Sequence, residues 1–171
     1  MSVGQVKVDL SKLEGIEQAL KSKYKVRVGI LGNKAAQKHD DTELTNYEIG
    51  SIHEYGSYSE GIPKRSFLLE PLTKLWGPGI IKSSEKFAEL LAEKRIYSFF
   101  RFLGFKGEEI VSDAFSTGGF GKWKPLKPET IKRRKKSKDP KPLTDTGQLA
   151  RSITSEVYVD NKRKEQNAQS N

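Results

Sequence analysis

The longest stretch of helical periodicity in the chain constrains its fold most. From Ile80 to about Phe115, apolar residues recur at the spacing that places them near one face of a helix. Two glycines inside this stretch, Gly104 and Gly107, predict a kink or a short break. The apolar positions are Phe87, Leu90, Leu91, Phe99, Phe100, Leu103, Ile110, Val111, Ala114 and Phe115.

Short segments with alternating apolar and polar residues predict the strands that such a helix would cover. The clearest runs from Tyr24 to Ile30, and a second covers residues 152–159 near the end of the chain. Residues 5–10 alternate in the same way and predict a further strand, followed by a short helix over residues 11–22. A sheet this small needs helices or a neighbouring subunit to cover it.

Weaker helical patterns lie between the first and last strands. Glu43 to Tyr55 is predicted to be helical, although Gly50 inside it is unfavourable for a helix. Phe67 to Trp76 predicts another helix, and Gly77-Pro78-Gly79 is expected to break the chain after it. The mostly polar stretch from Lys34 to Thr42 is predicted to be a loop.

The length of 171 residues is enough for one domain with a real core. We therefore predict an α+β fold: a small, mostly antiparallel sheet packed by several helices, with a long helical segment and extended arms. Residues 1–159 are predicted to form a single domain that includes a basic loop at 117–142, and residues 160–171 a polar C-terminal tail.

Composition narrows the function classes. The chain has no cysteine, which excludes a disulfide framework and a thiolate metal site. No window approaches the roughly 18 apolar residues needed to span a bilayer, and the first residues do not resemble a signal peptide. We expect a soluble protein made in the cytoplasm, with no membrane partner.

The net charge of +9 is concentrated in one segment. Between Gly121 and Lys141 there are ten basic residues and two acids, whereas the rest of the chain has 21 basic and 20 acidic residues. The segment contains the run Lys132-Arg133-Arg134-Lys135-Lys136, the predicted contact for a polyanion or a neighbouring ring subunit. Nucleic-acid phosphates and acids on a partner protein fit this run equally well. Trp123 in the same segment could stack on a base, but we favour an anchor that holds the loop to the body.

Catalytic and metal-binding patterns are weak. His39 and His53 are far apart in sequence and neither has a second histidine at helical spacing, so no metal site is predicted. Gly29 to Gly32 lacks the remaining residues of a phosphate loop, and we interpret it as a strand end. No Gly-x-Ser-x-Gly turn occurs. The sequence therefore favours a binding protein without a cofactor over an enzyme, and a hydrolase with an unrecognised site is the weakest alternative.

Three ordered motifs resemble a known family. The first is IHEYG at residues 52–56, followed by IPKRSFL at residues 62–68. The second is WKPL at residues 123–126, followed by Thr130-Ile131 and Arg133-Arg134, and the third is PLTDTGQL at residues 142–149, followed by Ser152-Ile153. Their order resembles the tail-completion and virion-morphogenesis proteins of tailed bacteriophages, above all the Mu-type group. The resemblance spans about Val26 to Val159, with Ser66 at a position where the family usually has proline.

The resemblance implies a structural protein of the virion neck, assembled in the host cytoplasm. Such proteins are ring subunits, often in sixfold order, at the interface of head and tail. The implied partners are further copies of the chain, a head-side connector or stopper protein, tail terminator and tube proteins, and viral double-stranded DNA in the channel. Arg65, Phe67 and Trp123 are the candidates for subunit packing, with Arg65 pairing with an acid across a subunit boundary. A tail terminator and a free basic nucleic-acid-binding protein are the alternatives.

Overall fold

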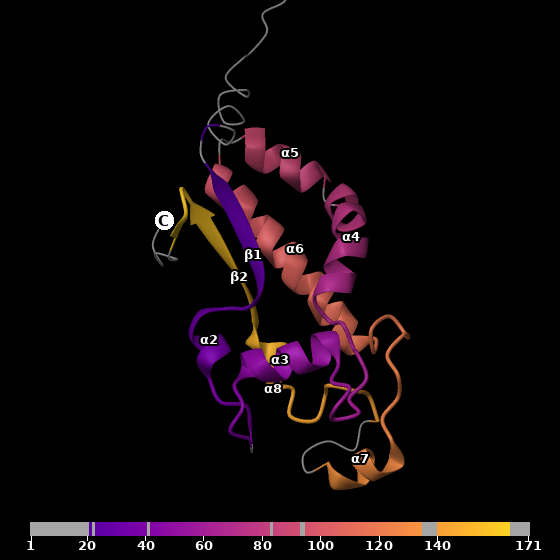
Figure 1. Ribbon diagram of the computed structural model, residues 1–171. Helices are drawn as coiled ribbons and strands as arrows, with labels where there is room; N and C mark the ends of the chain where they lie inside the picture. Colours follow the sequence, from indigo (N-terminus) through magenta and orange to yellow (C-terminus); the bar gives the residue numbers. More distant parts are fainter. Residues whose placement is uncertain are drawn as a thin grey trace, which may run out of the picture.

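The computed structural model describes residues 21, 23–40, 42–82, 84–92, 95–134 and 140–164. The strand predicted at residues 5–10 lies outside the described residues, as does nearly all of the helix predicted after it. In chain order the elements are β1 (Tyr24–Ile30), α2 (Gly32–Ala36), α3 (Asn46–Tyr55), α4 (Leu69–Lys82), α5 (Ser84–Ala92), α6 (Ile96–Ser116), α7 (Pro128–Arg133), α8 (Gln148–Ser152), β2 (Ile153–Val159) and β3 (Lys162–Arg163). The predicted α+β class is confirmed (Figure 1).

The sheet is antiparallel, with strand order β1-β2-β3. The two long strands pair along their whole length, from Tyr24 opposite Val159 to Ile30 opposite Ile153. The short strand β3 pairs with the end of β2 and lies inside the segment that was predicted to be a polar tail. The sheet therefore continues beyond residue 159. The sequence did not predict this strand because its two residues are both basic and exposed, and so show no alternation of apolar and polar side chains.

One face of the sheet is polar and solvated. The guanidinium of Arg27 lies 4.4 Å from the centre of the Tyr158 ring. The hydroxyl of Tyr158 donates to Glu156 at 2.8 Å, and Arg163 forms an ion pair with the same carboxylate at 3.1 Å. These contacts, two between neighbouring strands and one along β2, cover this face with polar groups, so that Glu156 is buried among polar partners while Arg27 and Arg163 stay exposed.

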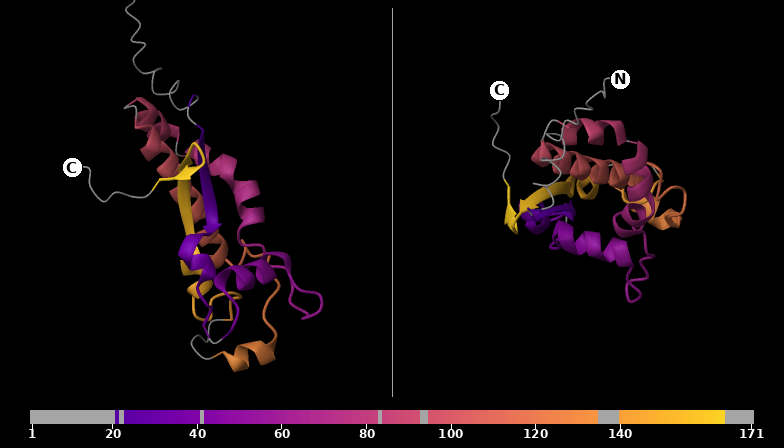
Figure 2. Two further views of the ribbon diagram at one scale, coloured as in Figure 1. Left: turned by 60° about the vertical axis from the view of Figure 1, so that its left-hand side comes forward. Right: turned by 90° about the horizontal axis from the view of Figure 1, so that it is seen from above.

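Helix α6 covers the other face (Figures 1 and 2). Its two glycines lie where it approaches the strands most closely. A Cβ atom at Gly104 would lie 2.5 Å from Ser155 Oγ, and one at Gly107 would lie 2.7 Å from a Val28 methyl group. The predicted break at these glycines is wrong: α6 is continuous from Ile96 to Ser116, and the missing side chains make room for the sheet.

The predicted break at Gly77-Pro78-Gly79 is also wrong. Helix α4 runs through this triplet to Lys82 and packs beside α6. Pro78 removes the N–H that would bond the carbonyl of Lys74, but both residues are exposed, so water can satisfy that carbonyl. A proline on the solvent side of a packed helix therefore does not end it.

The main core lies where the C-terminal half of α6 meets the start of α4 and α8. Its buried residues are Phe67, Val111, Phe115 and Leu149. The rings of Phe67 and Phe115 have centroids 5.1 Å apart, and Trp123 packs edge-on against Phe115 at 5.9 Å. No helix in the described part of the chain is long and apolar enough to cross a membrane.

We expect Gly104→Ala to lower the free energy of unfolding by about 1–3 kcal/mol, because the new methyl group overlaps Ser155 against a paired strand. Urea unfolding measures the change. The matched control is Gly79→Ala in α4, where the added methyl group would lie at an ordinary 3.5 Å from Ile110. That variant should be neutral or more stable, since alanine favours a helix over glycine by about 1 kcal/mol. Equal losses in both variants would contradict this account of the helix–sheet contact.

Candidate functional site

A buried carboxylate organises the end of the molecule that lies lowest in Figure 1. Glu54, near the end of α3, is 5% exposed. It accepts hydrogen bonds from the Ser66 hydroxyl at 2.5 Å and from the main-chain N–H groups of Phe67, Leu68 and Leu69, each at 3.0 Å. A negative charge at a helix start satisfies N–H groups that have no partner within the helix and interacts favourably with the helix dipole.

The remaining donors at the start of α4 are also satisfied. The main-chain N–H of Glu70 donates to Ser66 Oγ at 3.0 Å, and Pro71 has no N–H to satisfy. Ser66 thus both donates to Glu54 and accepts from Glu70. One hydroxyl therefore links the buried carboxylate to the first turn of α4.

The second motif is fixed to the first by two side chains. Arg65 donates through Nε and Nη2 to the main-chain oxygen of Lys124, at 3.1 and 3.0 Å. The indole N–H of Trp123 donates to the main-chain oxygen of Ser66 at 3.1 Å. The indole ring also occupies the space that a Cβ atom at Gly119 would need. The prediction that Trp123 anchors the loop to the body is confirmed.

For Phe67 the predicted role in subunit packing must be corrected, because its side chain is 1% exposed and offers no surface to a neighbouring chain. Arg65 is 5% exposed and faces the outside only where it lines the cleft described below. In the described part of the chain Arg65 forms no ion pair, because its two hydrogen bonds go to a main-chain oxygen. Phe67 acts inside the fold, whereas Arg65 both holds the main-chain oxygen of Lys124 and lines that cleft.

The third motif closes the same region. The main-chain N–H of Gln148 donates to Thr146 Oγ1 at 3.1 Å, and Gly147 between them has a left-handed φ of 69°, so these residues form a tight turn at the start of α8. The Gln148 side-chain amide donates to Lys38 O at 2.8 Å and to Asn46 Oδ1 at 3.0 Å. Asn46 Oδ1 also lies 2.8 Å from His39 Nδ1. We call the place where residues 52–56, 62–68, 123–126 and 142–149 meet the junction.

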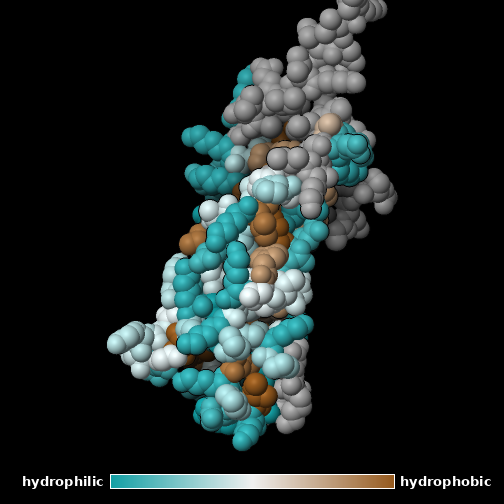
Figure 3. Space-filling view, turned by 90° about the vertical axis from the view of Figure 1, so that its right-hand side faces the viewer, coloured by the Kyte–Doolittle hydropathy of each residue, from teal (hydrophilic) through white to brown (hydrophobic). Residues whose placement is uncertain are grey.

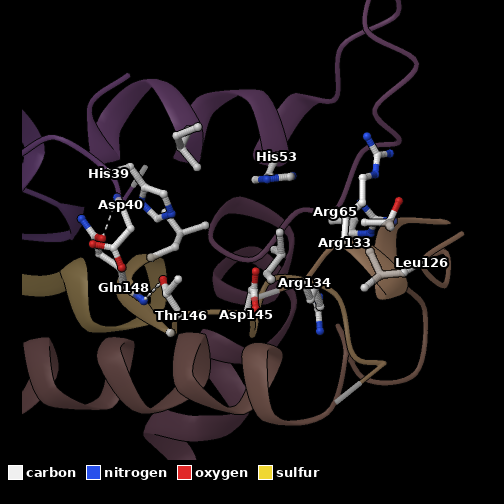
Figure 4. Close-up of a pocket in the computed structure, with 15 residues that line it drawn as sticks. His39, Asp40, His53, Arg65, Leu126, Arg133, Arg134, Asp145, Thr146 and Gln148 are labelled. Carbon is white, nitrogen blue, oxygen red and sulfur yellow. Dashed lines mark hydrogen bonds between the residues drawn. The ribbon is translucent and has the colours of Figure 1, made fainter. Parts of the chain in front are cut away.

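A cleft of about 480 Å³ lies at the junction (Figure 4). One end carries His39, Asp40, Thr146 and Gln148, and the other carries Arg65, Arg133 and Arg134. His53 and Asp145 lie between the two ends. The apolar parts of the wall are Ile49, Leu126, Leu143 and Leu149.

The two histidines, distant in sequence, thus line one cleft. Burial, with smaller contributions from the Arg65 guanidinium and from His39, lowers the pKa of His53 to about 4. Burial and the nearby Arg134 also lower the pKa of Arg65. Nδ1 of His53 is buried and has no hydrogen-bond partner in the described part of the chain. The described residues hold no cluster of three or more metal-ligating side chains.

The basic run does not form one surface. Lys132 and Arg133 are exposed on α7, whereas Arg134 is 9% exposed and donates through Nη2 to the main-chain oxygen of Lys141 at 2.7 Å. Lys135 and Lys136 lie outside the described residues. The run therefore divides between a solvated part and a part that turns into the cleft.

Sequence reasoning found the motif residues but missed the cleft. Glu54 and Asp145 look like ordinary polar residues of a helix and a turn, and His39 lies in a segment predicted to be a loop. Only the folded chain brings them together, since the junction joins segments more than 80 residues apart. Comparison with protein-family models, curated proteins and solved structures gave no match to this chain.

Substitution of the buried carboxylate should be costly. In Glu54→Gln one oxygen becomes an NH₂ group that faces two hydrogen-bond donors, so we expect a loss of roughly 2–4 kcal/mol in the free energy of unfolding. The matched control is Glu109→Gln, which removes the same charge from a side chain that is 59% exposed and paired with Lys106. It should cost no more than about 1 kcal/mol. Urea unfolding of both variants checks the difference, and similar losses would refute the capping role.

The lowered pKa of His53 predicts acid sensitivity. Between about pH 6.5 and 4 the unfolded chain binds a proton at this residue that the folded chain does not. The contribution of His53 to the free energy of unfolding is therefore fully present above about pH 6.5. It is lost progressively as the pH falls toward about 4, by up to about 3 kcal/mol. The variant His53→Gln should lose this part of the slope in unfolding experiments run across that range. An unchanged slope would show that carboxylates alone cause the acid sensitivity.

Proposed function

We propose that this protein is a structural subunit of the neck of a tailed bacteriophage, a tail-completion protein that forms a ring at the head–tail interface. One observation carries the proposal. The three motifs that resemble the phage family, dispersed from residue 52 to residue 153, pack together at the junction. The motifs resemble those of the family in their order along the chain, and they also pack into one unit. Together these two features support a fold shared with that family more strongly than isolated sequence matches do.

A ring subunit needs exposed side chains suited to protein contact, and α3 and its flanks supply them. Tyr47 and Tyr55 are 61% and 69% exposed, Leu44 is 38% exposed, and Tyr58 is fully exposed. We call these four residues the tyrosine surface. Tyr58 lies in a loop that projects from the body after α3 (Figure 2). Tyrosine is enriched at protein interfaces because it combines a large apolar ring with a polar tip.

The face that contains α4 looks different. Figure 3 shows apolar side chains there in small groups separated by polar ones, with no broad apolar patch on the described part of that face. Pro71, Leu75 and Phe120 line a pocket of about 350 Å³ there, among lysines and Glu70. The tyrosine surface is the better candidate for a ring contact.

The exposed cations of α7 favour a second candidate function. Lys132 and Arg133 are exposed on α7, which lies at the lower end of the molecule in Figure 1, and Lys127 is exposed just before that helix. Such a patch suits an acidic neighbouring ring, DNA in the channel of the virion, or DNA bound by a free protein. A free nucleic-acid-binding protein should bind duplex DNA as an isolated chain, with an affinity that falls steeply as salt rises.

Electron microscopy of particles from a phage that lacks the gene tests the proposal. We expect filled heads beside separate tails, because the ring that joins them is missing. Wild-type protein supplied in trans should restore joined particles, whereas a Tyr55→Ser/Tyr58→Ser variant should restore far fewer. Both side chains are largely exposed, so the variant should fold normally.

The matched control is Phe105→Ser, which removes an aromatic ring that is 50% exposed on α6 and does not belong to the tyrosine surface. This variant should restore joined particles. Tails of irregular length in the deletion would point to a tail terminator. Normal infectious particles would refute the neck role and leave the nucleic-acid-binding alternative.

A further inference from the structure

Arg65 is a buried cation without a carboxylate partner in the described part of the chain. Its side chain is almost wholly buried, and both of its hydrogen bonds go to the neutral main-chain oxygen of Lys124. Removal of a charge from water costs several kcal/mol unless an opposite charge compensates. Among the described residues, Arg65 itself therefore lacks the opposite charge that its burial calls for, since Asp145 in the same cleft forms no ion pair with it.

Two further groups face the same cleft. Arg134 is buried beside Arg65, close enough to lower the pKa of that residue. His53 contributes a ring whose Nδ1 has no hydrogen-bond partner in the part of the chain described. These three side chains come from α3, from the segment before α4 and from the end of α7, and Figure 4 shows them around one space with Arg133 at its rim.

The shape of the cleft limits what the missing anion can be. A volume of about 480 Å³ suits a small ligand or one or two side chains. A DNA duplex carries its phosphates on the outside of a rigid cylinder, where they meet protruding cations rather than recessed ones. A carboxylate on a flexible side chain can enter the cleft, and its two oxygens match the planar fork of a guanidinium.

The walls favour a peptide over a free anion. Ile49, Leu126, Leu143 and Leu149 provide apolar contacts next to the arginines. Asp145 in the middle of the cleft and Asp40 at the far end would repel a ligand that is negatively charged along its whole length. The cleft therefore fits an acidic residue with an apolar neighbour.

We propose that the cleft binds a glutamate or aspartate side chain from an acidic segment of a protein partner. Arg65, Arg133 and Arg134 hold the carboxylate, and the leucine-rich wall holds the adjacent apolar residue. The proposal rests on the proposed function only for the identity of that partner, a neighbouring protein of the neck.

The test uses the full chain and an acetylated, amidated peptide, Leu-Glu-Glu-Leu, with Leu-Gln-Gln-Leu as the matched control. NMR follows the His53 ring signals as each peptide is added. We expect saturable shifts with the glutamate peptide and at least roughly tenfold weaker binding of the glutamine peptide. The bound carboxylate should also raise the pKa of His53 from about 4, because it stabilises the protonated ring.

Adjacent positions on α7 supply matched variants. Arg133→Gln and Lys132→Gln each remove one positive charge from an exposed position, but only Arg133 lines the cleft. We expect Arg133→Gln to weaken binding of the glutamate peptide by roughly tenfold and Lys132→Gln to change it by less than about twofold. Neither position belongs to the core, so both variants should fold.

Equal binding of the two peptides, or the absence of a saturable shift at His53, would overturn the proposal. Displacement of the glutamate peptide by an equimolar amount of duplex DNA would overturn it in favour of a phosphate site. Failure of these tests leaves the outcome of the gene deletion untouched. Conversely, the peptide could bind selectively while the gene deletion still gives normal particles. That result would support carboxylate binding by the cleft and refute only the proposed role in the neck.

Discussion

The Glu54 carboxylate is the contact on which this end of the molecule depends. By accepting the first N–H groups of α4, it fixes where that helix begins and how residues 62–68 pass α3. That segment in turn places Arg65 against Lys124 and Phe67 in the core. One carboxylate thus links the end of α3 to the start of α4, and through that segment to a core aromatic residue and to the loop that closes the cleft. Its hydrogen bonds matter because burial of the first N–H groups of a helix without acceptors would be costly.

Helix α6 connects this junction to the sheet. Its central glycines, Gly104 and Gly107, allow the backbone to lie against β1 and β2, while Val111 and Phe115 one to two turns later enter the core with Phe67. The helix is continuous across both contacts. One continuous helix therefore holds both the sheet and the junction. The position of the cleft relative to the strands follows from the close packing of this helix at Gly104 and Gly107.

The parts of the fold that follow a simple period could be predicted from the sequence. The strand at Tyr24–Ile30 was clear because one face of the sheet is buried and the other is solvated. The continuity of α4 through Pro78, and of α6 through its glycines, could not be predicted, since both depend on which side of the helix faces a neighbour. The cleft was invisible for the same reason: its polar residues have no periodicity, and their importance comes from burial that only the tertiary contacts create.

The basic run shows how a charge pattern can mislead when it is taken as a surface. In sequence, Arg133 and Arg134 are equivalent members of one cluster. In the structure α7 ends between them, so that Arg133 stays exposed while Arg134 turns inward to the main-chain oxygen of Lys141 and the neighbourhood of Arg65. The burial of each arginine determines which anions can reach it. A solvated cation in high dielectric attracts any polyanion weakly, and salt screens it. A recessed guanidinium interacts more strongly, but only with an anion small enough to enter. The proposed selectivity for a protein carboxylate over a DNA phosphate therefore rests on the geometry of the cleft and not on the number of positive charges.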